Sequence, residues 1–316
     1  MDAHAADIGF TTDAFEVWDD RFERLLHRES RLERLWSGAQ WSEGPVYLPA
    51  EDCVLWSDIP NDRVLRWSEH AGVSVELHPA GFANGHAIDL QGRVVRCEHG
   101  GRRISRVESD GSVVTVVDNY RGARLNSPND VVVKSDGTIW FTDPPYGILS
   151  DREGHRANSE LGGNYVFRFD PGAQELAIVS DALEEPNGLA FSPDESVLYV
   201  SDTSAALRKD GTGNHHILAF DVIDGERLLN PRVFAVVSPG LADGFRVDVA
   251  GNVFTSSADG IHVYAPDGTR LGRIGVPEVV SNCAFGGPER DRLFITASAS
   301  LYAIRLATRG AGVRAQ

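Results

Sequence analysis

Apolar residues in this chain occur in short runs, and these runs recur in a fixed order. Each recurring unit starts with a polar residue, continues into a short apolar strand, turns, and returns in a second apolar strand, usually followed by a third. Such units begin at residues 42, 84, 129, 187, 243 and 282. In "EEPNGLAFSP" (184–193), for example, Asn187 and Gly188 lead directly into an apolar run. Turns such as "SDG" and "VAGN" suit tight hairpins. The pattern therefore predicts antiparallel strands throughout this region.

Six matched units of about 40–58 residues, each built from short strands, are typical of the blades of a propeller. A β-sandwich, the alternative all-β fold, would not need six matched copies. We therefore predict an all-β fold, a six-bladed β-propeller. The last unit, which ends at "LYAIRL" (301–306), has room for only three strands, whereas "RLERLWSG" (31–38) has the pattern of a strand. We expect this N-terminal strand to complete the last blade and close the ring.

The chain then divides into an extension, one domain and a tail. We expect residues 31–306 to form the propeller as a single catalytic domain. Residues 1–30 form an N-terminal extension, with a short helix expected within residues 12–28, and residues 307–316 form a C-terminal tail.

The residue that enters the first strand is polar in all six units. In a propeller the first strand of each blade lines the central channel, so these side chains should converge at one mouth of it. Asn or Asp before Gly is a common turn residue, which explains any one of these positions but explains six of six poorly. The six residues are Glu43, Asn84, Asn129, Asn187, Asp243 and Asn282.

A second set of positions lies where the second strand of each unit ends. Because this strand runs back towards the same mouth, its end should lie on the same face as the first set. The positions are Asp58, Glu98, Asp143, Asp202, Ser257 and Ala297. For Asp58 and Asp202 a solvated strand end is an equally good interpretation. Asp143 lies in "WFTDPPYG", where two prolines fix the backbone, and a functional role is favoured there.

Two insertions lengthen the third and fourth units after their second strands, "ILSDREGHRANSELGGN" (148–164) and "TSAALRKDGTGNHH" (203–216). We expect both to overhang the polar mouth as partial lids, because loops on a rigid scaffold often carry binding residues. His86 and His99 map near the mouth, where they either contact substrate and carry protons or serve as hydrogen-bonded structural residues. The residues to which we assign substrate contacts are Asn84, His86, His99, Tyr146 and Asn282.

Charge and cysteine content restrict the classes of partner. The 46 acidic residues exceed the 30 basic ones, and the net charge of −16 argues against nucleic acid, whose binding requires Lys and Arg to neutralise phosphates. Cys53, Cys97 and Cys283 form neither a disulfide framework nor a CxxC pair, so we expect a reducing compartment. No apolar run reaches the roughly 18 residues of a membrane span, and the N-terminus lacks the pattern of a secretory signal. We expect a cytoplasmic monomer or dimer, or a periplasmic protein if a signal has been trimmed.

A ring of side-chain oxygens selects hard cations. Ca²⁺ accepts carboxylate and amide oxygens in irregular geometry, whereas zinc prefers the His and Cys that this ring lacks. We expect Ca²⁺, with Mg²⁺, Mn²⁺ or Zn²⁺ as substitutes, held by Glu43, Asn129, Asn187 and Asp243. Such an ion polarises a carbonyl and acidifies a bound water, and a nearby carboxylate can act as a general base. Hydrolysis of an ester, lactone or phosphoester fits this chemistry. The chain contains neither the G-x-S-x-G motif of serine hydrolases nor a dinucleotide-binding G-x-G-x-x-G after a strand.

Several segments together resemble the gluconolactonase/regucalcin (senescence marker protein) family, and its bacterial gluconolactonase branch in particular. They are "WSEGPVY", "ANGHAIDLQGRVVRCEHGGRRISRV", "LNSPNDVVVKSDGTIWFTDPPYG", "EPNGLAFSPDESVLYVSDT" and "ADGFRVDVAGNVFTS", within residues 30 to 306. The resemblance implies a six-bladed propeller with one catalytic divalent cation, usually Ca²⁺. It places metal ligands at Glu43, Asn187 and Asp243, a metal or substrate contact at Asn129, and an acid/base role at Asp143.

The resemblance and the ring together predict a metal-dependent lactonase that opens a sugar lactone such as glucono-1,5-lactone. We expect Asp243 to bind the ion and help activate water, with Asp143 as the second acid/base. The alternatives are an organophosphatase or aryl-ester lactonase on the same scaffold, and a calcium-binding propeller without catalysis.

Overall fold

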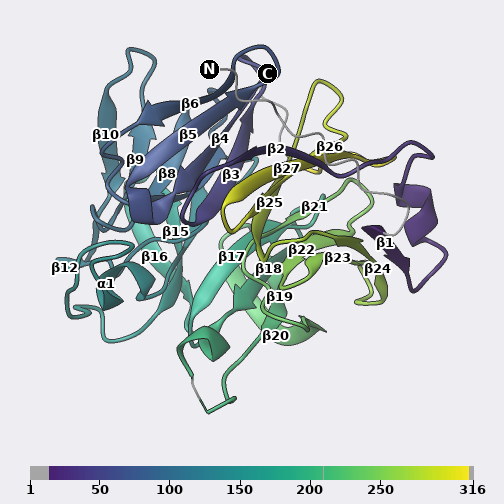
Figure 1. The fold of residues 1–316 in the computed structure, drawn as a ribbon. Helices are drawn as coiled ribbons and strands as arrows, with labels where there is room; N and C mark the ends of the chain where they lie inside the picture. The colour runs from purple at the N-terminus through teal and green to yellow at the C-terminus, as the bar shows by residue number, and fades with distance from the viewer. Residues whose placement is uncertain (1–13, 209, 313–316) are drawn as a thin grey trace.

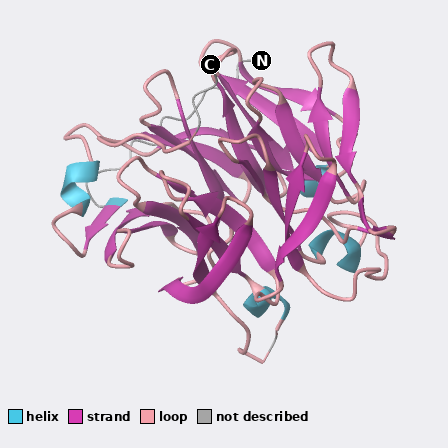
Figure 2. Ribbon diagram, turned by 180° about the vertical axis from the view of Figure 1, so that it is seen from behind, coloured by secondary structure: helices cyan, strands magenta, loops and turns pink. Residues whose placement is uncertain are grey.

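The protein is described by a computed structural model that covers residues 14–208 and 210–312. Six antiparallel sheets are arranged around one axis (Figure 1). Seen from behind, the ring consists almost entirely of strands and loops (Figure 2). The prediction of a six-bladed β-propeller is confirmed. Among the described residues, no helix has the length and hydrophobicity that a membrane span requires.

Each blade runs from an innermost strand at the axis to an outermost strand at the rim. Blade one is β3 (Ser42–Leu48), β4 (Cys53–Asp58), β5 (Arg63–Ser68) and β6 (Gly72–Leu77). Blade two is β7 (Ala83–Ile88), β8 (Val94–Glu98), β9 (Arg103–Val107) and β10 (Val113–Val117). Blade three is β13 (Val131–Val133), β14 (Ile139–Asp143), β15 (Tyr165–Asp170) and β16 (Glu175–Ser180).

The second half of the chain repeats this order. Blade four is β17 (Pro186–Phe191), β18 (Val197–Asp202), β19 (His216–Ile223) and β20 (Arg227–Val236). Blade five is β21 (Phe245–Val247), β22 (Val253–Ser257), β23 (Gly260–Tyr264) and β24 (Arg270–Gly275). Blade six is β25 (Val280–Gly286), β26 (Arg292–Ala297), β27 (Ser300–Arg305) and the N-terminal β2 (Glu33–Ser37). The hairpin of β11 (Asn119–Tyr120) and β12 (Ala123–Arg124) connects blades two and three. Other short elements follow the second strand within a blade: the 3-10 turn Ile59–Asn61 in blade one, the helix α1 (Tyr146–Leu149) in blade three and the 3-10 turn Ser204–Leu207 in blade four.

The ring is closed by strands from opposite ends of the chain. The N-terminal strand β2 pairs antiparallel with β27, with Glu33 opposite Ala303 and Ser37 opposite Ser300, as predicted. At the axis, β25 of the last blade packs against β3 of the first, and the innermost strands contact one another all the way round. Between the blades lie large, fully buried aromatic side chains such as Trp56, Trp140 and Phe254, which form the core.

The N-terminal extension differs in part from our expectation. Within the described part of residues 12–28, the structure has a short 3-10 helix, Phe22–Leu25, and also a strand that we did not expect, β1 (Phe15–Val17). Strand β1 pairs with β24 and gives blade five a fifth strand. The Arg270 guanidinium lies over the Trp18 ring at 3.6 Å, which fixes this segment further. The C-terminal tail also lies against the ring, through a β-bridge between Gly310 and Asp248.

Candidate functional site

The ring predicted from the sequence lines a pocket at the mouth of the channel. The cavity has a volume of about 370 Å³. Its lining includes one polar residue from the entrance of each of the first five blades: Glu43, Asn84, Asn129, Asn187 and Asp243. Two other predicted residues, His99 and Tyr146, also line it. The structure thus brings together seven of the predicted site residues, which come from five separate units of the sequence.

The Asn-Gly step that opens a blade is required by the close approach of neighbouring inner strands. The Gly188 N–H donates to the Asp243 carbonyl at 3.0 Å, and the Ser201 hydroxyl donates to the same oxygen at 2.9 Å. A Cβ atom at position 188 would lie 2.3 Å from that oxygen, closer than any real Cβ contact. In the same way, the Thr142 hydroxyl donates to the Asn187 carbonyl at 2.6 Å. Asn187 and Asp243 are therefore each held by the preceding blade through the backbone carbonyl, so this contact does not use their side chains.

Two carboxylates dominate the electrostatics of the pocket. Burial raises the pKa of Glu43 well above its usual value, and the negative charge of Asp243 adds to this effect. The pKa of Asp243 is raised to about 7, mainly by burial and also by the nearby charges of Asp130 and Glu153, while Asn187 opposes the shift. Within the described chain, neither Glu43 nor Asp243 forms a salt bridge with Lys, Arg or His. Two such carboxylates in a shared site require either protons or a cation to offset their charge.

A buried charge pair lies near these two carboxylates. Arg246, on the inner strand β21, donates to Asp130 at 3.2 Å, and the two form a buried ion pair. Arg246 is thus paired with Asp130, although its charge also interacts with that of Glu43. Neither Glu43 nor Asp243 takes part in this ion pair.

Two amides of the ring have side-chain oxygens that accept no hydrogen bond from the described residues. The Asn187 Nδ2 donates to the Thr203 hydroxyl at 3.1 Å, the Asn187 side chain also hydrogen-bonds Asp243, and no described group donates to the Asn187 Oδ1. The Thr203 hydroxyl is in turn 2.6 Å from the Tyr146 hydroxyl. The Asn129 side chain makes no hydrogen bond with any described residue and lines the pocket. Carboxylate and amide oxygens are the ligands that Ca²⁺ accepts.

The residues present therefore fit a hard divalent cation. The described chain contains no group of three or more His, Cys, Asp or Glu side chains that could hold a metal. The four predicted ligands do not form such a group because two of them, Asn129 and Asn187, are amides. Two carboxylates without cationic partners, together with two available amides, suit Ca²⁺ better than zinc.

His99 has a positioning role that the sequence left open. Its Nδ1 donates to the Glu153 carbonyl at 2.9 Å, so the neutral ring accepts at Nε2 from the Asn84 Nδ2, 3.3 Å away. Burial lowers the pKa of His99 to about 4, so the ring is neutral near pH 7. His99 therefore fixes Asn84 and joins it to the lid loop that carries Glu153.

Three predicted residues lie outside the pocket lining. His86 is buried, with its Nδ1 2.8 Å from the Gly44 carbonyl and its Nε2 without a hydrogen-bond partner among the described residues. Asn282 donates to the Glu43 carboxylate at 3.1 Å and thus supports a pocket residue from behind. Asp143 is fully buried and accepts from the backbone amides of Asn126 and Ser127 at 2.7 and 2.8 Å.

Two other carboxylates, Asp58 and Asp202, lie at the ends of second strands in the same way as Asp143. Asp58 accepts from the backbone amide of Gln40 at 2.9 Å, and Asp202 accepts from that of Glu184 at 2.8 Å. In all three blades, a carboxylate at the end of the second strand binds the loop that leads into the first strand. Burial raises the pKa of Asp143 to about 7, and the two backbone amides oppose the shift. This geometry makes Asp143 a loop anchor, and the acid/base role that we expected stays a prediction.

Sequence reasoning missed several residues of the pocket lining: Trp41, Ile59, Arg152, Glu153, Thr203, Ala206 and Leu241. Four of them come from the two insertions that were expected to form lids. The lengths of those insertions indicated where lid residues would lie, but nothing in the sequence indicated which side chains would turn inwards.

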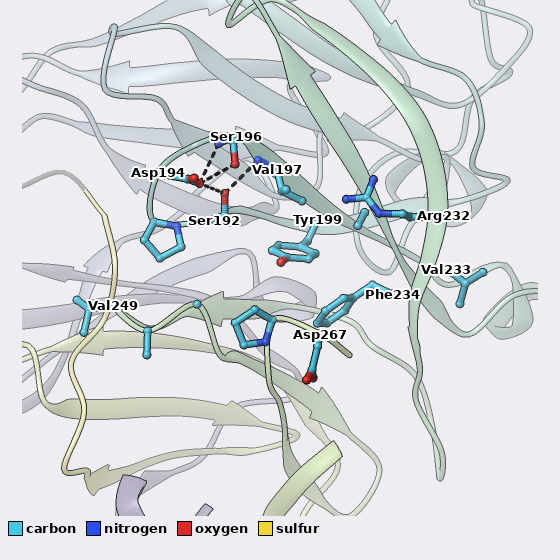
Figure 3. Close-up of a pocket in the computed structure, with 15 residues that line it drawn as sticks. Ser192, Asp194, Ser196, Val197, Tyr199, Arg232, Val233, Phe234, Val249 and Asp267 are labelled. Carbon is cyan, nitrogen blue, oxygen red and sulfur yellow. Dashed lines mark hydrogen bonds between the residues drawn. The ribbon is translucent and has the colours of Figure 1, made fainter. Parts of the chain in front are cut away.

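A second cavity, of about 590 Å³, lies away from this ring, between blades four and five (Figure 3). Its lining includes Tyr199 and Phe234, whose ring centroids are 4.7 Å apart. Asp194 accepts from Ser192 and Ser196 of its own turn, as the dashed lines of Figure 3 show. No residue of the predicted ring lines this cavity, and its acidic groups are used by local turns. The smaller, ring-lined pocket is therefore the candidate active site.

A six-bladed propeller with an acidic, oxygen-lined pocket at its axis agrees with the family that the sequence resembles. This chain belongs to the family described as the SMP-30/Gluconolactonase/LRE-like region, whose model matches residues 41–299. It is 35% identical to a gluconolactonase of Zymomonas mobilis, over 96% of this chain and 88% of that protein. It is 30% identical to the pentonolactonase XacC of Haloferax volcanii, over 80% of each.

Solved structures agree with this assignment. A gluconolactonase of Xanthomonas campestris superimposes with a TM-score of 0.86 at 42% identity, over 92% of this chain and 94% of that one. A regucalcin of Agrobacterium tumefaciens, described as a calcium-binding protein, superimposes with a TM-score of 0.71 at 18% identity, over 89% of this chain and 94% of that one. The second likeness supports the propeller fold alone.

Proposed function

We propose that this protein is a metal-dependent sugar lactonase, with glucono-1,5-lactone as its substrate. The observation that carries the proposal is the pair of carboxylates, Glu43 and Asp243, which share one pocket and have no cationic partner in the described chain. The relatives named as gluconolactonase and pentonolactonase support a lactone as the substrate class.

Glu43, Asn129, Asn187 and Asp243 would hold the cation, and Ca²⁺ suits these four oxygen donors. The bound ion would polarise the lactone carbonyl and acidify a water molecule. Asn282 keeps the Glu43 carboxylate in place, and Thr203 accepts from the Asn187 amide and so restrains that side chain. A cavity of about 370 Å³ has the size expected of a site for a small molecule.

Lactone hydrolysis with and without EDTA tests the proposal. We expect the purified protein to hydrolyse glucono-1,5-lactone, to lose activity in EDTA and to recover it with Ca²⁺. Glu43→Gln and Asp243→Asn should each lose both activity and bound metal, whereas Asp194→Asn, which changes a carboxylate in the distant cavity, should lose neither. Unchanged activity and metal content in both pocket variants would refute the proposal.

A further inference from the structure

The lid loop over the pocket is held firmly at its backbone. Besides the bond from His99 to the Glu153 carbonyl, the His155 N–H donates to the Gly147 carbonyl at 3.0 Å. Gly154 packs so tightly on Gly147 that a Cβ atom there would lie 2.0 Å from the Gly147 carbonyl oxygen. The ring of His155 also stacks edge-on against Phe82, with centroids 5.2 Å apart. The backbone from Glu153 to His155 is therefore fixed against blade two and the start of the lid.

The Glu153 side chain lines the pocket together with Glu43 and Asp243. It makes no hydrogen bond with any described residue. Its negative charge is one of the causes that raise the pKa of Asp243, so the two carboxylates lie near each other. Burial also raises the pKa of Glu153, and the neighbouring Arg152 opposes the shift.

The other titratable groups of the pocket already have partners. Asn282 donates to Glu43, and both ring nitrogens of His99 are in hydrogen bonds. The Tyr146 hydroxyl is bonded to Thr203, and burial raises its pKa far above the neutral range. Arg152 cannot release a proton at physiological pH. With Asp243 assigned to the cation, Glu153 is the acid/base group of the pocket whose side-chain oxygens remain available.

We propose that Glu153 is the catalytic residue that transfers the proton during lactone hydrolysis. The Glu153 carboxylate accepts a proton from the attacking water as the water oxygen forms its bond to the carbonyl carbon. Glu153 then gives this proton to the ring oxygen as the bond between that oxygen and the carbonyl carbon breaks. The products are a hydroxyl group and a carboxylic acid, the acid loses its own proton to solvent, and Glu153 returns to its starting state. The inference rests on the proposed lactonase function.

Steady-state kinetics of Glu153→Gln and Glu153→Ala on glucono-1,5-lactone test this role. Removal of a general acid/base typically lowers the rate by about 100-fold or more, so kcat should fall by that factor while KM changes less than about threefold. Formate fits the space that Glu153→Ala opens, and it should restore part of the activity of this variant but none to Glu153→Gln. Glu160→Gln is the matched control, because Glu160 lies in the same insertion and does not line the pocket.

The outcomes separate this inference from the proposed function. A wild-type protein without activity on any lactone refutes the function itself. An active wild type whose Glu153→Gln variant keeps its kcat, or changes only in KM, overturns the role of Glu153 alone. So does a slow Glu153→Ala variant that formate does not rescue, when its melting temperature and calcium content equal those of the wild type.

Discussion

Gly188→Ala tests whether close packing of the inner strands holds the ring residues in place. The added Cβ would lie 2.3 Å from the Asp243 carbonyl oxygen and 2.9 Å from the Gly244 Cα. An ordinary contact begins at 3.4 Å, so the strands β17 and β21 must separate by about 1 Å (3.4 − 2.3). That movement would also stretch the Gly188–Asp243 hydrogen bond from 3.0 Å to about 4 Å, beyond its useful range.

The cost of this substitution follows from two contributions. Overpacking of a close contact typically costs about 1–3 kcal/mol, and loss of a backbone hydrogen bond costs about 0.5–1.5 kcal/mol. Together they lower the free energy of unfolding by about 2–4 kcal/mol. A chain of this length loses about 2 °C of melting temperature per kcal/mol, so we expect Tm to fall by about 4–8 °C.

The assay is calorimetry, which measures the Tm of the Gly188→Ala variant and of a control variant, Gly172→Ala. Gly172 lies in a surface turn, and its new Cβ would meet only the flexible Asp170 carboxylate, at 3.3 Å. The control should therefore melt within about 1 °C of the wild type, since surface substitutions of this kind change stability by less than about 0.5 kcal/mol. A Gly188→Ala variant that melts with the control would refute the reasoning.

Three further predictions concern the groups around the ring. Thr203→Val removes the hydroxyl that orients Asn187, so Ca²⁺ affinity measured by titration calorimetry should fall about 10-fold, or about 1.4 kcal/mol; an unchanged affinity would contradict this. Burial lowers the pKa of His86 from 6.5 to about 4. As the pH falls, the unfolded chain therefore binds a proton at this residue before the folded protein does. The free energy of unfolding should drop by up to about 3 kcal/mol between pH 6.5 and pH 4. His86→Asn keeps a donor for the Gly44 carbonyl and should remove this part of the pH dependence, measured by urea unfolding of both proteins at each pH. Asp143→Asn should lower the free energy of unfolding by about 1–3 kcal/mol, while kcat measured below the melting range stays unchanged. A large loss of kcat at unchanged Tm would instead indicate that Asp143 takes part in catalysis.

The fold could be predicted because each blade carries its own local signals. Hairpin turns and alternating apolar strands recur six times, and the missing strand of the last unit pointed to the N-terminal strand that closes the ring. Strand β1 could not be predicted in this way, because it has no counterpart in the other blades. Its position depends on contacts with blade five, such as that of Trp18 with Arg270, which no local pattern reveals.

The site was predicted in part, for a geometric reason. The first strand of each blade lies at the axis, so a polar residue at its entrance faces the channel, as Asn187 and Asp243 do. The second strand lies about 4.8 Å further out, so a carboxylate at its end meets the loop of its own blade instead. For this reason Asp243 lines the pocket and Asp143 does not, although both lie on the same face of the propeller. Glu153 was missed because it lies on an insertion that has no equivalent in the other units.

Anomalous diffraction from crystals of the active protein soaked in Mn²⁺ tests the central claim most directly. The account predicts one anomalous peak at the mouth of the channel, surrounded by side-chain oxygens of Glu43, Asn129, Asn187 and Asp243. The absence of a peak there in metal-dependent, active protein, or a peak bound only by other residues, would contradict the account.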